Sequence, residues 1–385
     1  MSTPLLVYNC SVFMTKKLAN FNTKWCELLS VEFLNFTPDH WLQFSPPSCT
    51  THLLFAIIYL FIVVPGILGN CIILWLFIRV RCLRTPKNLL SMNIVLSDLL
   101  MNCKIPVFIY NSLNCAPVTG IRGCELYGFV GGLSGTATIT SITVVTLERY
   151  WTISRIKRNH VLTFRMSVFL IVVIWIYALA FALPPLLGLI NHYVPEGFLT
   201  TCSFDYLSED IHSKIFVFVF FMGSYVAPLC LIIFSYSSIY MKAMRSTKRF
   251  YSQVTEDQRA VETIRKRMAK KKFKLGKTTL LLISLWSFAW TPYAIVALLG
   301  IFNKKALLTP FMSMIPAVFA KCASIIDPFV YGNSHPTFRR EIKHLFTGTL
   351  QESPRNVTFN LTSSMSTRRS RIQTKRKSFI QDAAL

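Results

Sequence analysis

The chain has 385 residues, of which 52% are hydrophobic and only 15% are charged, and its formal net charge is +24. Soluble domains carry about 25% charged residues, so this composition favours a membrane protein over a soluble domain. A basic excess of this size can also indicate a nucleic-acid-binding protein, and the positions of the charges decide between the two.

Seven apolar runs follow one another along the chain, each of about 20 residues or more, enough to cross a bilayer core of about 30 Å as a helix. A buried helix of a soluble protein is the alternative for any one run, but seven in series make that alternative hard to sustain. We therefore predict an all-α membrane protein, a seven-transmembrane helix bundle spanning residues 52–332. The runs lie at 53–78, 88–114, 125–152, 168–190, 215–240, 278–302 and 307–332.

Basic residues are concentrated on one side of this predicted bundle. The connections after the first, third and fifth runs and the tail from residue 333 hold most of the 41 lysines and arginines. Such loops face the cytoplasm, which predicts an extracellular N-terminus and a cytoplasmic C-terminus in the cell membrane. The positive charge is explained by this topology and by the anionic lipid of the inner leaflet, so we expect no nucleic-acid partner.

Residues 1–51 form the predicted extracellular tail and show little periodicity. Asn9 and Asn35 begin N-x-S/T motifs there and are candidate glycosylation sites. Cys124 and Cys202 both fall on the outer side, in an oxidising compartment, which predicts a disulfide between them. Four further outer cysteines have no assigned state at this point, namely Cys10, Cys26, Cys49 and Cys115.

The inner segments predict three features. The loop at 242–277 is charged and free of proline, which indicates helical extensions of the fifth and sixth runs. Apolar residues recur at helical spacing within 333–348, and this predicts a short amphipathic helix on the inner membrane surface. Residues 349–385 are polar and form the predicted cytoplasmic tail.

Ionisable side chains inside a bilayer are costly and are candidate functional residues. Lys321 lies roughly 16 Å from the inner end of the seventh run, near the middle of the membrane, at about 1.5 Å per residue. Snorkelling to an interface is the alternative, but the lysine stem is short for that depth. Desolvation favours the neutral amine, which forms Schiff bases with carbonyl compounds, so we interpret Lys321 as an attachment point for a carbonyl ligand. The other ionisable residues in or at the ends of the runs are Asp98, Lys104, Glu148, Arg149 and Asp327.

A ligand at Lys321 needs a cavity, and two runs supply candidates for its wall. Gly131, Gly132 and Gly135 lie near one face of the third run and leave room beside the backbone, although close helix packing would also favour them. Trp290 lies near the depth of Lys321, and Pro292 should kink that helix. A core aromatic is the alternative for Trp290.

The motifs of successive runs resemble those of class A G-protein-coupled receptors, over about residues 52–346. They are Asn70, Asp98, "ERY" at 148–150, Trp175, Pro228, "WTPY" at 290–293 and "DPFVY" at 327–331. Lys321, seven residues before Pro328, stands where opsins carry the retinal-binding lysine. The stretches "KIPVFIYNS" (104–112), "VPEGFLTTCSFDYL" (194–207), "LLTPFMSMIP" (307–316) and "IDPFVYGNSHP" (326–336) resemble arthropod rhabdomeric opsins, above all their ultraviolet-sensitive branch.

The resemblance implies a light-activated receptor that is not an enzyme and that binds retinal on Lys321, 11-cis in the dark and all-trans after light. The implied retinal pocket contains Gly131, Gly132, Gly135, Trp290 and Tyr293. The implied partners are a Gq-type heterotrimeric G protein, arrestin and a receptor kinase, in the rhabdomere membrane if the protein is visual. The kinase would act on the tail, at Ser363, Ser364, Ser366, Thr367 and Ser370. No metal site is expected.

Three residues are implied to tune the Schiff base. A lysine at the position of Lys104 is associated with ultraviolet tuning in that branch, and a nearby cation lowers the proton affinity of a Schiff base. An unprotonated Schiff base in the dark is therefore expected. The resemblance makes Glu196 the counterion and Tyr127 a neutral hydrogen-bond partner, while a solvated loop carboxylate is the alternative for Glu196.

A switch at the inner side is also implied, in which Trp290 and the kinked sixth run transmit the ligand's change of shape. Arg149 would leave Glu148 and turn toward Tyr236 or the G protein, and Asp98 and Asp327 would share an internal sodium or water network. The full set of switch residues is Glu148, Arg149, Tyr150, Tyr236, Asp98, Asp327, Pro328 and Tyr331.

Four alternatives stay open at this point. His335-Pro336-Thr337 lacks the basic third residue of the rhabdomeric pattern, which allows a nonvisual opsin. A chemoreceptor of the same fold would use Lys321 to pair with a ligand carboxylate. A microbial-type light-driven ion pump would also hold retinal on a lysine of its last helix, but "ERY" and "DPFVY" argue against it. A retinal photoisomerase would use the same lysine as a signalling opsin.

Overall fold

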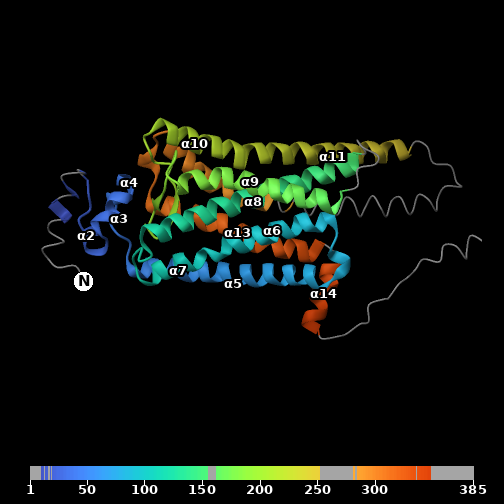
Figure 1. The fold of residues 1–385 in the computed structure, drawn as a ribbon, viewed down its shortest axis with the longest axis horizontal. Helices are drawn as coiled ribbons and strands as arrows, with labels where there is room; N and C mark the ends of the chain where they lie inside the picture. Colours follow the sequence, from blue (N-terminus) through green and yellow to red (C-terminus); the bar gives the residue numbers. More distant parts are fainter. Residues whose placement is uncertain are drawn as a thin grey trace, which may run out of the picture. The chain divides into compact units, whose positions relative to one another are not determined.

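The computed structural model describes residues 10–12, 14–15, 18, 20–154, 162–251, 281, 284–334 and 336–347. Long helices run beside one another through most of this part of the chain (Figure 1). Within the described residues, six helices are long and apolar enough to cross a membrane, and the seventh run forms α13, with a shorter apolar segment at Pro310–Ile326. The predicted all-α membrane fold is therefore confirmed.

Each of the seven runs becomes a helix or a pair of consecutive helices. The long helices are α5 (Cys49–Arg79), α6 (Pro86–Cys103) with α7 (Ile105–Leu113), α8 (Gly120–Ser154), α9 (Phe164–Leu186), α10 (Ile211–Phe221) with α11 (Ala227–Tyr251), an unlabelled helix over Ser284–Ile301, and α13 (Pro310–Ser334). Single 3-10 turns, Arg81–Leu83 and Lys305–Leu307, precede α6 and α13.

Polar N-caps explain where several helices begin. A short polar side chain before the first turn accepts a hydrogen bond from an otherwise unpaired backbone N–H, which stabilises the helix start by about 1 kcal/mol. Ser48, Thr85, Thr163 and Asp210 do this for α5, α6, α9 and α10.

Two irregularities occur where helices pass the interior of the bundle. α6 ends at Cys103 and α7 begins at Ile105, because Pro106 in the first turn of α7 cannot donate a backbone hydrogen bond. Lys104 occupies the break. In the fifth span, Met222–Val226 forms a π-helical turn between α10 and α11. Such breaks redirect side chains, and both of these border the cavity described below.

A two-stranded hairpin follows α9. β1 (Tyr193–Glu196) pairs antiparallel with β2 (Thr201–Phe204), so that Glu196 faces Thr201 across the ladder. Gly197 and Leu199 in the connecting turn have positive φ, 60° and 63°. A disulfide between Cys124 and Cys202 ties β2 to the start of α8.

The N-terminal segment is more ordered than its lack of periodicity indicated. Its described residues include the short helices α2 (Trp25–Leu28), α3 (Val31–Phe36) and α4 (Asp39–Leu42). Disulfides join Cys10 to Cys26 and Cys49 to Cys115. The four outer cysteines whose state the sequence left open are therefore paired in the structure. We call residues 20–44 the N-terminal cap.

The cap packs onto the hairpin end of the bundle. Trp25, Trp41 and Leu42 share one buried cluster with Leu199 of the hairpin turn and Val296 of helix Ser284–Ile301. His40 Nε2 lies 2.8 Å from the backbone oxygen of Leu308, before α13. The fold of the N-terminal cap depends on these tertiary contacts, which sequence periodicity does not reveal.

Described residues after the fifth and seventh spans are helical. α11 continues to Tyr251, beyond the predicted end of the fifth span at residue 240, as a helical extension requires. The extension of the sixth span falls on residues 252–280, outside the described residues, as does the tail from residue 348. A helix α14 (Pro336–Thr347) forms where the amphipathic helix was predicted.

Candidate functional site

A cavity lies inside the bundle, bordered by α6, α8, the fifth span, helix Ser284–Ile301, α13 and the hairpin. Most of its wall is apolar or aromatic, with Phe220, Phe221, Trp286 and Trp290 on it. Three charged residues reach it, namely Lys104, Glu196 and Lys321. An apolar pocket with a few convergent polar groups is the usual form of a small-molecule site.

Lys321 extends from α13 into this cavity. Its side chain is only 6% exposed, so it does not snorkel. The Nζ donates a hydrogen bond to the backbone oxygen of Ala317 at 3.1 Å and lies 5.3 Å from the centroid of the Tyr59 ring. Among the described residues it forms no ion pair. The amine therefore stands in an apolar, aromatic setting that it shares with the cavity.

The three predicted glycines do line the cavity, and two of them make room for its polar and aromatic residues. A Cβ at Gly131 would lie 2.0 Å from Lys104 Nζ, and one at Gly135 would lie 3.0 Å from Cη2 of Trp290. A Cβ at Gly132 would lie 3.0 Å from the Tyr193 hydroxyl. The absence of side chains on this face of α8 thus serves the cavity wall.

Lys104 and Tyr127 are in direct contact. Lys104 Nζ lies 4.4 Å from the centroid of the Tyr127 ring, within the range of a cation–π interaction. Lys321 Nζ lies 5.8 Å from the same centroid. The two lysines, more than 200 positions apart in the chain, are thereby brought to one aromatic side chain that is 2% exposed.

Glu196 is buried, at 4% exposure, so the alternative of a solvated loop carboxylate is wrong. Its Oε2 accepts hydrogen bonds from the hydroxyls of Tyr206 and Tyr293, both at 3.1 Å, and from Ser313 at 3.3 Å. Burial raises the pKa of Glu196 above its ordinary value, and the charge of Lys321 is the largest of the effects that oppose this rise. The carboxylate is held by hydroxyls inside the protein.

Trp290 and Tyr293 connect the cavity to neighbouring elements. The Trp290 ring stacks on Trp286, with centroids 5.8 Å apart, and meets Tyr293 edge-on at 6.5 Å. The Tyr293 hydroxyl, whose proton goes to Glu196, also lies 2.6 Å from the Ser203 hydroxyl of β2 and can accept a hydrogen bond from it. A displacement of the Trp290 ring would therefore also shift its neighbours Trp286 and Tyr293 on helix Ser284–Ile301.

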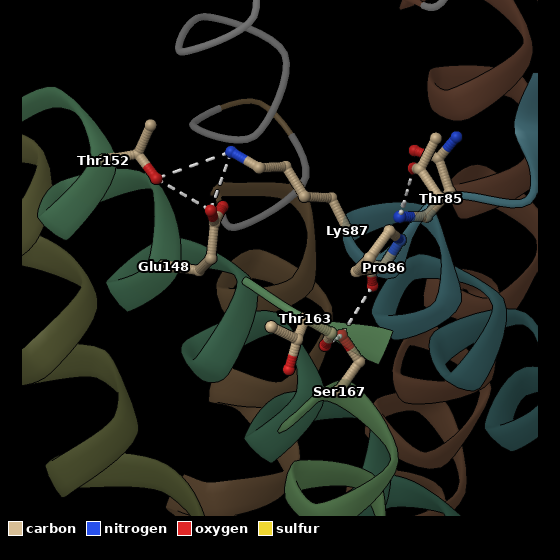
Figure 2. A network of polar contacts seen from close by, with 8 residues as sticks. Thr85, Pro86, Lys87, Glu148, Thr152, Thr163 and Ser167 are labelled. Carbon is tan, nitrogen blue, oxygen red and sulfur yellow. Dashed lines mark hydrogen bonds and ion pairs between the residues drawn. The ribbon is translucent and has the colours of Figure 1, made fainter. Parts of the chain in front are cut away.

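The opposite end of the bundle holds the "ERY" motif, and here the structure adds a residue that sequence reasoning missed. Lys87, at the start of α6, forms an ion pair of 2.7 Å with Glu148 Oε1, which also accepts a hydrogen bond from Thr152 at 2.8 Å (Figure 2). Ser167 of α9 donates to the Pro86 oxygen at 2.9 Å in the same view. Lys87 was visible only as one of several basic residues in its connection.

The remaining switch residues are placed as follows. Asp98 is 3% exposed and accepts a hydrogen bond from Thr138 at 3.3 Å. The Tyr150 ring packs on Phe234 with centroids 5.7 Å apart, and Tyr236 packs on the buried cluster around Ile142. The backbone of Arg149 belongs to α8, and Pro328 is buried in α13 near Gly69. The side chains of Asp327 and Tyr331 lie outside the described residues.

Of the two candidate glycosylation sites, only one can be placed. Asn35 is exposed on α3, while its motif partner Thr37 is buried and donates to the Phe33 oxygen at 2.8 Å. Asn9 lies outside the described residues.

Comparison with known proteins gives consistent matches. The model of the 7 transmembrane receptor (rhodopsin family) matches residues 69–331. The chain is 36% identical over 333 residues to the ultraviolet-sensitive opsin of Apis mellifera, covering 84% of this chain and 88% of that one. It is 33% identical over 314 residues to Opsin Rh4 of Drosophila melanogaster, covering 80% and 82%. The crystal structure of squid rhodopsin superposes with a TM-score of 0.74 at 26% identity, covering 84% of this chain and 93% of that chain.

Proposed function

This chain belongs to the rhodopsin family of seven-transmembrane receptors and, within it, to the opsins, and from that membership we propose that it is a light receptor carrying retinal as a Schiff base on Lys321. The resemblance to class A receptors and arthropod opsins is thereby confirmed, and the chain is a signalling receptor, not an enzyme. The observation that carries the proposal is the Lys321 amine, buried at the wall of an apolar cavity.

The residues of the cavity fit retinal. Retinal is an elongated apolar molecule with an aldehyde at one end, and the wall offers aromatic surface from Phe220, Phe221 and Trp290, with an amine at Lys321. When bound, retinal supplies light absorption and a change of shape from the 11-cis to the all-trans form. Lys321 holds the ligand in place, and Gly131 and Gly135 leave the room that it needs.

We propose ultraviolet sensitivity from the balance of charge in the cavity. Glu196 is the one carboxylate among the described lining residues, and it can compensate one cation. The Lys104 cation already competes for the negative charge of Glu196. A proton on the Lys321 Schiff base would add a second cation that has no counter-charge. One of the similar relatives is described as an ultraviolet-sensitive opsin, which supports the same proposal of ultraviolet sensitivity.

Signal transfer follows from the packing around Trp290. Because Trp290 touches the cavity and stacks on Trp286, we propose that helix Ser284–Ile301 moves when the ligand changes shape, opening the opposite end of the bundle to a Gq-type G protein. Glu148 and Arg149 lie at that end, with Lys87 as the partner of Glu148. An extracellular N-terminus, a cytoplasmic C-terminus, and binding of arrestin and a receptor kinase to the tail belong to this proposal.

Covalent trapping tests the attachment. The chain is incubated with 11-cis retinal, reduced with borohydride and analysed by mass spectrometry. We expect one retinyl group on Lys321 in the wild type, none in Lys321→Ala, and a normal adduct in Lys304→Ala, which removes a lysine outside the cavity. An unmodified wild-type chain would favour the chemoreceptor alternative, and an adduct on another lysine would show that the site is misassigned.

A further inference from the structure

The charged groups of the cavity are unequal in number and are not paired with one another. Among the described residues, two amines and one carboxylate line it, and the carboxylate of Glu196 is held by three hydroxyls. Lys321 Nζ donates to a backbone oxygen, and Lys104 Nζ lies over an aromatic ring. In the part of the chain that the structure describes, neither amine forms an ion pair. The cavity thus has room for one more negative charge.

The two amines also lie near the same side chain of the cavity wall. Their Nζ atoms lie 4.4 and 5.8 Å from the same ring centroid, that of Tyr127. The rest of the wall is dominated by aromatic side chains such as Phe220, Phe221 and Trp286. The aromatic lining and the excess of amines together match an apolar molecule with a single anionic head.

We propose that, before retinal is attached, this cavity binds an apolar carboxylate non-covalently, with its head group at the amines of Lys104 and Lys321 and its tail along the aromatic wall. A charge-assisted hydrogen bond from a buried ammonium to a carboxylate is stronger than one between neutral groups, so the acid binds in preference to the matching alcohol. The bound acid occupies the Lys321 amine and therefore slows attachment of retinal. This inference rests on the proposed function only in using the same cavity.

Binding to the purified, retinal-free chain provides the first test. Retinoate and retinol share one apolar body and differ in the head group, as do oleate and oleyl alcohol. Because Trp286 and Trp290 line the wall, a change in tryptophan fluorescence reports binding. We expect at least one acid to bind about tenfold tighter than its alcohol, as a hydrogen bond to a charged group allows. The pair that shows the preference identifies the ligand as a retinoid or a fatty acid, and equal affinities in both pairs would overturn the proposal.

Variants show whether the two lysines are responsible. We expect Lys104→Gln and Lys321→Gln each to reduce the preference for the acid and the double variant to abolish it. Lys214→Gln removes a lysine that is hydrogen-bonded to Asn303 outside the cavity, and it should keep the preference. A double variant that still prefers the acid, while eluting as a folded monomer, would contradict the assignment.

A measurement on the wild type keeps the test decisive even if a variant fails to fold. The rate of borohydride-trappable attachment of retinal is measured with retinoate or retinol present. Slowing by retinoate alone supports the proposal, whereas equal slowing by both overturns it. Normal trapping without an acid preference would reject this inference and leave the proposed function intact. An acid preference without trapping would reject retinal attachment and leave the carboxylate site.

Discussion

At the scale of single residues, the behaviour of the cavity depends on Lys104, Glu196 and Lys321. The position of these side chains in the cavity depends on more than the helix or strand that carries each of them. Lys104 reaches the cavity because Pro106 breaks the second span, and Glu196 reaches it because a hairpin turns back into the bundle. Together they bring a second amine and a carboxylate to the cavity that holds the Lys321 amine.

The first prediction concerns the absorption spectrum. Reconstituted with 11-cis retinal, the wild type should absorb in the ultraviolet, because the cation at Lys104 disfavours a proton on the Schiff base. Lys104→Glu replaces that cation with a carboxylate and should move the maximum into the visible range. A wild type that absorbs in the visible range, with no change in Lys104→Glu, would refute the role of Lys104.

The second prediction concerns the pH dependence of stability. Since burial raises the pKa of Glu196, the folded chain takes up a proton before the unfolded chain does as the pH falls. The buried carboxylate costs stability above its raised pKa, and this cost disappears on acidification. In thermal unfolding of the retinal-free protein, the wild type should therefore gain stability relative to Glu196→Gln from neutral to mildly acidic pH. A relative loss over that interval would contradict the assigned burial.

At the scale of elements, the N-terminal cap and the connection between α6 and α8 are the two features with consequences for function. The cap's buried cluster includes Val217 and Ala297, which also line the cavity. The cap therefore supports this part of the cavity wall directly, and a disulfide ties Cys26 of the cap to Cys10, which precedes it in the chain.

Loosening the cap should expose the ligand attachment to water-soluble reagents. Replacing Cys10 and Cys26 with serine removes a cross-link over 16 positions, worth about 3 kcal/mol for a loop of that length. We expect hydroxylamine to destroy the dark pigment several-fold faster in this double variant. Cys71→Ser, which changes an exposed free cysteine on α5, is the control. Equal rates in all three proteins would show that the cap does not guard the site.

The ion pair between Lys87 and Glu148 should restrain the inactive state. It joins α6 to α8, but the Lys87 side chain is 52% exposed, so the pair contributes about 1 kcal/mol or less. Lys87→Gln should accordingly raise nucleotide exchange by the G protein in the dark by no more than about fivefold. Thr152→Val removes only the neighbouring hydrogen bond and should have a smaller effect. Unchanged or reduced dark exchange in Lys87→Gln would show that the pair is no restraint.

At the scale of the whole molecule, the spans could be predicted because length and apolarity are properties of contiguous sequence. The mid-membrane depth of Lys321 followed from helical rise, and the structure places its side chain in the cavity. The cap, the pairing of Lys87 with Glu148 and the burial of Glu196 could not be predicted in this way. Each depends on contacts between segments that are far apart in the chain, so no local pattern records them.

Light-dependent activation of a G protein tests the central claim most directly. Membranes holding the chain and 11-cis retinal are assayed for nucleotide exchange on a Gq-type G protein, in the dark and under ultraviolet light, beside Lys321→Ala. The account predicts exchange that rises with light in the wild type and shows no light dependence in Lys321→Ala. Exchange that is independent of light in the wild type, or equally light-dependent in Lys321→Ala, would contradict it.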